Sequence, residues 1–196
     1  MSNYCIDNKT QILDWYNNVK HIHFNNTIKR HHLTLSYIID NNKVILYIHG
    51  YFKAHFLRIV DIFLNENEMI KCQKNMCTNI TKEVLNEDMY ILHSSFKNSI
   101  FPSLPIKNLN ISEYNYIKRS ETSLKIASKI LPNIEKSPCL FSIKSGFSYT
   151  ILTSNNDNKT YIESYREINI DLPKIIIDII PILFFKYMLN IYFYIK

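Results

Sequence analysis

The sequence predicts an α+β protein with antiparallel strands. Segments with strand character and segments with helical character are intermingled along its 196 residues, and short connections join them. An apolar fraction of 46% is enough for a core, and 13% aromatic residues argue against disorder. Only two glycines are present. The chain therefore has no glycine-rich phosphate loop, which excludes P-loop NTPases, kinases and Rossmann dehydrogenases.

The first half of the chain is expected to contain helices and a β-hairpin. Apolar residues at helical spacing predict helices over residues 8–20 and 53–64. Residues 31–39 and 43–49 are rich in β-branched and apolar side chains and predict two strands, joined by a turn at Asp-Asn-Asn. A further apolar run at residues 89–96 also has strand character.

The second half is expected to contain one helix and a second hairpin. Residues 120–131 have apolar residues at helical spacing, with Ser120 placed as an N-cap and Pro132 as the stop. Residues 138–153 and 159–170 alternate between apolar and polar side chains, which predicts two paired strands.

The C-terminal segment, residues 171–196, is distinct from a main domain over residues 1–170. From 175 to 195 it is almost wholly apolar and about as long as a bilayer is thick. Two interpretations follow: a tail anchor that associates with a membrane, or an element buried in the core or against a protein partner.

Composition also bears on location and partners. The net charge of +6 comes mostly from lysine, and the excess of Asn, Ile, Lys and Tyr fits the A/T-rich genome of a virus, a parasite or a bacterium. Lysine enrichment of this origin does not indicate a stable duplex nucleic-acid partner. The N-terminus lacks a signal peptide, and the four cysteines form no CxxC pair, so a cytoplasmic, reducing location is expected.

Two short histidine segments suggest a reaction. They read His32-Leu33-Thr34-Leu35 and His93-Ser94-Ser95-Phe96. In a strand, residues i and i+2 share a face, so each imidazole would have a hydroxyl beside it. Two such units facing each other would surround one phosphate. One histidine would act as general base and the other as general acid, and the hydroxyls would bind phosphate oxygens, without metal or cofactor.

These segments resemble the two signature motifs of the 2H phosphoesterase (LigT-like) superfamily. The resemblance implies two α/β lobes whose antiparallel sheets face a central cleft, formed by residues 1–170. It makes His32 and His93 catalytic and gives Thr34 and Ser95 the phosphate-binding role. The implied activity is metal-independent cleavage of a small nucleotide. Its substrate would be a cyclic dinucleotide such as 2′,3′-cGAMP or 2′-5′ oligoadenylate, which viral members destroy to blunt host immune signalling.

Another pair of histidines and the C-terminal segment allow other interpretations. His21 and His23 form an H-x-H pair, but no carboxylate or cysteine stands at ligand spacing, so no metal site is expected. The alternative from a different functional class is a non-enzymatic viral interaction protein. Its C-terminal apolar segment would then bind a membrane or a protein partner.

Overall fold

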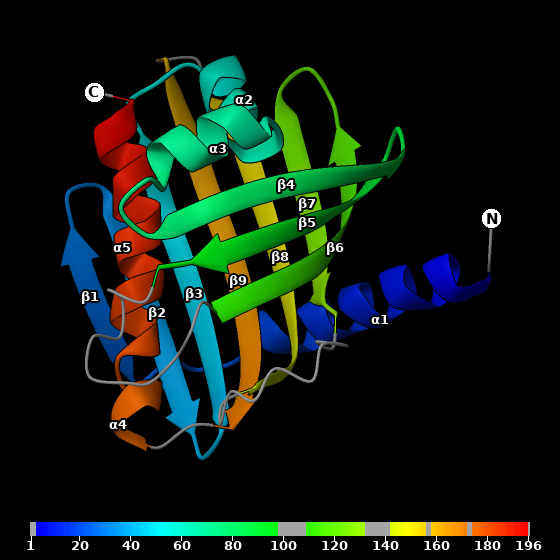
Figure 1. Cartoon of the computed structure of the whole chain (residues 1–196). Helices are drawn as coiled ribbons and strands as arrows, with labels where there is room; N and C mark the ends of the chain where they lie inside the picture. The colour runs from blue at the N-terminus through cyan, green and yellow to red at the C-terminus, as the bar shows by residue number, and fades with distance from the viewer. Residues whose placement is uncertain (1–2, 98–108, 132–141, 156–157, 172–173, 196) are drawn as a thin grey trace.

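The computed structural model describes residues 3–97, 109–131, 142–155, 158–171 and 174–195. These residues form five helices and nine strands (Figure 1). The helices are α1 (Asn3–Val19), α2 (Phe56–Leu64), α3 (Glu66–Cys72), α4 (Lys174–Ile177) and α5 (Ile180–Tyr194). The strands are β1 (Asn26–Arg30), β2 (Leu33–Asp40), β3 (Lys43–Phe52), β4 (Cys77–Asn86), β5 (Met89–Phe96), β6 (Leu109–Arg119), β7 (Ser123–Ile130), β8 (Ser142–Asn155) and β9 (Lys159–Asp171).

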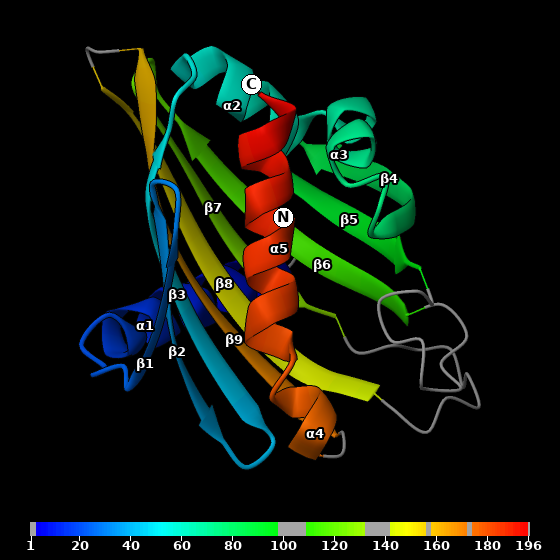
Figure 2. The same ribbon diagram turned by 90° about the vertical axis from the view of Figure 1, so that its left-hand side faces the viewer.

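All nine strands belong to one antiparallel sheet in the order β1-β2-β3-β9-β8-β7-β6-β5-β4. The sheet is strongly curled, so that β4–β6 lie across from β1–β3 (Figure 2). Helix α5 runs along the concave side between these two edges (Figure 2). The predicted pair of α/β lobes is therefore wrong, because there is a single continuous sheet with one concave face.

The C-terminal segment is part of the core. Most positions of α5 are apolar, and side chains such as Phe185, Met188 and Ile191 are buried against the inner face of the sheet. Burying a side chain of this size stabilises the fold by about 1.5–3 kcal/mol. Of the two interpretations of this segment, α5 therefore fits the buried element. In the described part of the chain, no helix has the length and hydrophobicity needed to cross a membrane.

Helix α1 covers the opposite, convex face of the sheet. Its residues Ile12 and Val19 are buried there beside aromatic side chains of β8 and β9. Tyr16 stacks on Tyr149 with ring centroids 4.1 Å apart, and the Trp15 indole donates a 2.8 Å hydrogen bond to Glu167 Oε2. The helix expected over residues 8–20 is present, and it begins earlier than its apolar spacing indicated.

The helix expected over residues 120–131 is instead strand β7. Leu124, Ile126 and Ser128 are buried on one face, while the intervening side chains point to the other. Ser120, which was interpreted as a helix cap, closes the β6–β7 hairpin, where its amide donates a 2.8 Å hydrogen bond to the Ser123 carbonyl. Pairing with β6 and β8 decided the conformation, because both neighbours supply a full ladder of hydrogen bonds.

The hairpin of β2 and β3 depends on a glycine at its base. Gly50 has φ +146°, a backbone conformation that L side chains rarely adopt. A Cβ atom at this position would lie 2.0 Å from the backbone oxygen of His32. That same oxygen accepts a 3.1 Å hydrogen bond from the amide of Tyr51, the residue after Gly50. This hydrogen bond holds the His32 carbonyl close to Gly50.

Gly50→Ala is expected to destabilise the protein by at least about 2 kcal/mol, because the methyl group collides with backbone and the φ angle is strained. Urea unfolding measures the effect. Thr27→Ala, an exposed position on the neighbouring β1, is the control and should change stability by no more than about 0.5 kcal/mol. An equally mild effect at both positions would contradict this account of Gly50.

Candidate ligand-binding site

A cavity of about 220 Å³ lies inside the curled sheet, between its concave face and helices α3 and α5. Most of its wall is apolar. The contributing side chains include Ile62, Phe63, Met69, Ile126, Phe184 and Met188. The cavity exists because α5 fills the concavity only in part. A cavity with such walls is suited to an apolar molecule.

A row of polar residues crosses the inner face of the sheet within this cavity. Cross-strand pairing places one residue from each of five adjacent strands side by side. From β5 to β9 these residues, called the polar row below, are Tyr90, Asn115, Ser128, Ser148 and Arg166, and all five line the cavity. Buried polar side chains cost free energy unless they are hydrogen-bonded, so their partners are informative.

The middle of the polar row satisfies its own hydrogen bonds. The Ser128 hydroxyl donates to Asn115 Oδ1 at 2.7 Å, and the Asn115 amide nitrogen donates to the Glu113 backbone carbonyl at 2.8 Å. Asn115 and Ser128 are almost fully buried. This part of the row is therefore a fixed feature of the cavity wall and leaves little for a ligand to bind.

The Arg166 end of the row carries a charge pair. Arg166 Nη1 lies 3.1 Å from Glu113 Oε1, and both side chains are mostly buried. The guanidinium also lies over the Phe184 ring of α5, at 5.3 Å from its centroid. Arg166 Nε, a buried donor, has no hydrogen-bond partner. The pair thus places two opposite charges beside an otherwise apolar space.

Two tyrosine hydroxyl groups also belong to the cavity. Tyr90 is in the polar row, and Tyr187 faces the cavity from α5. Burial raises the pKa of both phenols, and the negative charge of Glu113 raises them further. Both hydroxyls therefore remain protonated at physiological pH and can donate hydrogen bonds.

Contacts between α3 and α5 close one side of the cavity. The buried Gln73 side chain donates to the Tyr187 carbonyl at 3.0 Å and accepts from Asn190 at 3.0 Å. Nearby, the Tyr194 hydroxyl donates to Glu68 Oε2 at 3.0 Å. These bonds fix α5 relative to α3 and thereby the shape of the cavity.

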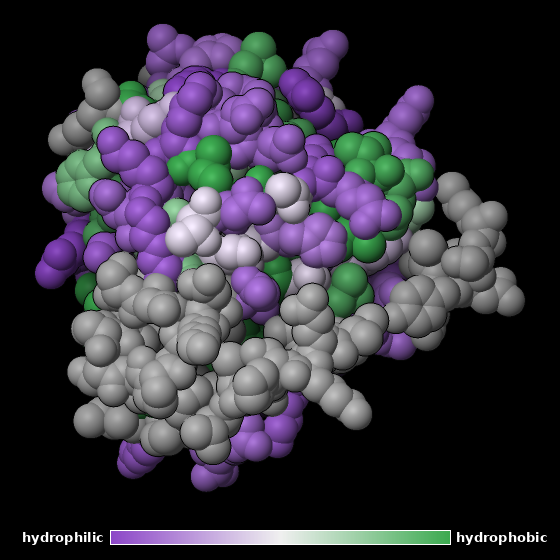
Figure 3. Space-filling model, viewed as in Figure 1, coloured by the Kyte–Doolittle hydropathy of each residue, from purple (hydrophilic) through white to green (hydrophobic). Residues whose placement is uncertain are grey.

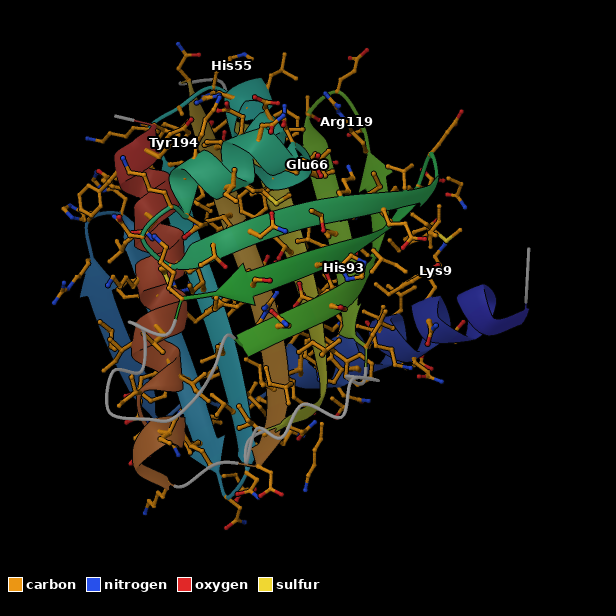
Figure 4. The ribbon with its side chains drawn as sticks, in the orientation of Figure 1. Lys9, His55, Glu66, His93, Arg119 and Tyr194 are labelled. Carbon is orange, nitrogen blue, oxygen red and sulfur yellow. The ribbon has the colours of Figure 1, made fainter. Side chains whose placement is uncertain are left out.

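The predicted second histidine segment lies on β5, but its two functional side chains point away from the cavity. Leu92, Ser94 and Phe96 line the cavity, so alternation places His93 and Ser95 on the outer face. Figure 4 labels His93 on this strand, in front of the sheet. The surface there is mostly hydrophilic where described residues are visible (Figure 3). His93 Nδ1 is 2.8 Å from Ser112 Oγ, and His93 Nε2 is 3.8 Å from Glu83 Oε2.

The first histidine segment lies near the opposite edge of the sheet. His32 is in the turn before β2, and its ring stacks on Tyr51 with centroids 4.4 Å apart. Thr34 follows on β2 between the buried Leu33 and Leu35, so it faces outward. Five strands separate β2 from β5 in the sheet. The structure therefore does not bring the two segments together around one phosphate.

The residues that do converge on the cavity were not singled out from the sequence. Arg166, Glu113 and Tyr90 are spread over three strands, and only the register of the sheet brings them together. A signal existed in β7, where Ser128 interrupts an alternating row of buried apolar residues. The inward position of Ser128 was missed because this segment was interpreted as a helix.

Comparison with known proteins identifies the fold. No family model matches the sequence, and no curated protein matches it. Among solved structures, human StAR-related lipid transfer protein 5 has a TM-score of 0.74 at 9% identity, over 100% of this chain and 98% of that one. Human STARD10 gives 0.71 at 11% identity over 94% and 78%. The lipid transfer and protein localization domain of human StarD13 gives 0.66 at 12% over 95% and 96%.

The chain therefore has the fold of StAR-related lipid transfer domains. At these identities the likeness shows the fold alone. The resemblance to 2H phosphoesterases was wrong, and so was the nucleotide phosphodiesterase activity built on it. The C-terminal segment that the alternative expected to dock on a membrane or partner forms α5, and α5 contributes buried side chains to the core. The expected small-molecule partner agrees with an internal cavity, whereas a nucleotide finds no support there.

Removing one member of the charge pair is expected to be more damaging than removing both. Arg166→Leu leaves Glu113 mostly buried and uncompensated, which should cost about 3 kcal/mol of unfolding free energy. The double variant Arg166→Leu, Glu113→Leu should recover most of that loss. Urea unfolding of the wild type, both single variants and the double variant measures the coupling. Additive effects would show that the two charges do not interact.

The buried thiols of Cys72 and Cys77 should make stability fall at alkaline pH. Burial raises the pKa of Cys72 to about 12 and that of Cys77 to about 11, from an ordinary 9.0. The unfolded chain loses these protons first. The thiols' contribution is therefore complete below pH 9 and is lost as the pH rises toward 12.

The measurement is the change in unfolding free energy between about pH 8 and about pH 10.5, compared with a Cys72→Ala, Cys77→Ala variant. The wild type should lose more stability over this interval, by up to about 1.4 kcal/mol per pH unit for each thiol. Identical slopes in the two proteins would mean that neither thiol has a raised pKa.

Proposed function

We propose that this protein binds a small lipid or another small hydrophobic molecule in the cavity between the sheet and α5. The observation that carries the proposal is the internal cavity of about 220 Å³, whose walls are mainly apolar side chains. For scale, an engineered apolar cavity of about 150 Å³ binds benzene. Two of the structures with the same fold are named for lipid transfer, which supports the same class of ligand.

The proposal calls for binding rather than catalysis. Among the described residues that line the cavity there is no histidine. Its thiol, Cys72, has a raised pKa and is a poor nucleophile. A cytoplasmic location remains part of the proposal. The free, buried thiols Cys72 and Cys77 support it, because unpaired cysteines suit a reducing compartment.

Ser94→Phe should abolish ligand binding, because Ser94 lines the cavity and a phenyl group there occupies the space a ligand needs. Naphthalene is a suitable probe, since it is apolar, compact and fluorescent. We expect the affinity for naphthalene to fall by more than about tenfold, which corresponds to about 1.4 kcal/mol.

Ser95→Phe is the matched control. It makes the same change at the next residue of β5, where the side chain points outward, and should leave naphthalene binding unchanged. Circular dichroism establishes that both variants are folded. Absence of saturable naphthalene binding by the wild type, or equal loss in the two variants, would contradict the cavity as the binding site.

A further inference from the structure

Several hydrogen-bond donors of the cavity wall have no acceptor among the described residues. In the described part of the chain, the hydroxyls of Tyr90 and Tyr187 form no hydrogen bond with another residue. Arg166 Nε also lacks an acceptor. The acceptors nearby are engaged, since Glu113 binds the two Nη atoms of Arg166 and Asn115 Oδ1 binds Ser128. A ligand that completes this site must supply an acceptor.

The two tyrosines line the cavity from its two walls. Tyr90 comes from β5 at one end of the polar row, and Tyr187 comes from α5, which lies over the sheet. Both tyrosines and Glu113 line this one cavity. The remaining wall is mainly apolar. The cavity therefore has one hydrogen-bonding region and one hydrophobic region.

The charge pair selects against an ionised ligand. Arg166 and Glu113 neutralise each other at 3.1 Å, so the site has no excess positive charge. A carboxylate or phosphate in the cavity would add an unpaired negative charge beside Glu113, in surroundings that stabilise ions poorly. An uncharged acceptor, such as a carbonyl oxygen, can accept hydrogen bonds from the donors without burying an unpaired charge.

The size of the cavity limits the ligand further. Scaled from a cavity of about 150 Å³ that binds benzene, a volume of 220 Å³ suits roughly nine non-hydrogen atoms. A phospholipid with two acyl chains is far larger than this. A single short chain or a small ring system is the matching size.

Resting on the proposed binding function, we propose that the cavity takes a compact, uncharged amphiphile whose carbonyl or similar acceptor is held by the hydroxyls of Tyr187 and Tyr90. The apolar part of the ligand lies against the side chains of α5 and the inner sheet. The ligand class is thus a small ketone, aldehyde or ester rather than a fatty acid anion or a phospholipid.

A series of probes with the same chain length tests this directly: octane, 2-octanone and octanoate, titrated calorimetrically or by ligand-observed NMR at pH 7.4. We expect 2-octanone to bind at least about tenfold more tightly than octanoate. Tyr187→Phe should lower the affinity for 2-octanone by roughly five- to tenfold, which is the loss expected for one hydrogen bond. It should leave the affinity for octane unchanged. Tyr90→Phe should act in the same direction.

Tyr149→Phe is the matched control. It also removes a single hydroxyl from a buried tyrosine, but on the convex face beneath α1. It should leave the affinity for each of the three probes unchanged. Octanoate as the tightest ligand, or equal 2-octanone affinity in the wild type and both cavity variants, would overturn the assignment while leaving the proposed binding function intact. No binding of any of the three probes, together with no binding of naphthalene, would overturn the proposed function itself.

Discussion

The burial of helix α5 against the concave face of the curled sheet is the interaction on which the rest of the structure depends. The inner face presents Leu46, Ile48 and other fully buried side chains that would otherwise meet water. The helix supplies the complementary apolar surface, and its partners come from strands at distant positions in the sequence. The cavity is a consequence of this packing, because a straight helix does not completely fill a curved trough.

The polar row gives the interior its chemical character. A core built only for stability would place apolar side chains at these inward positions, since buried ion pairs are often no more stabilising than hydrophobic replacements. Here Arg166 and Glu113 are mostly buried beside the cavity, and Tyr90 and Tyr187 leave hydroxyls available. Polar groups kept at such a cost fit a site that recognises a molecule.

The histidine segments show how a correct local rule led to a wrong conclusion. Alternation along a strand does place His93 and Ser95 on one face, but that face is the outer one. Ser94, the neighbour that the motif ignored, is the residue that reaches the cavity. In β7, Ile126 and Ile130 are four residues apart, a spacing that fits a helix as well as a strand, so the period alone did not distinguish the two structures.

The sequence by itself determined the local elements with strong patterns: the first helix, the β2–β3 and β8–β9 hairpins, antiparallel pairing, and an apolar C-terminal segment. Periodicity fixes which side chains share a face and turn residues fix where strands reverse, and both are encoded within a few neighbouring residues. Only the tertiary structure decided which face is inside, that α5 enters the concavity, and that Arg166 meets Glu113. The reason is that these outcomes depend on the register and curvature of nine strands, which no short segment of the chain contains.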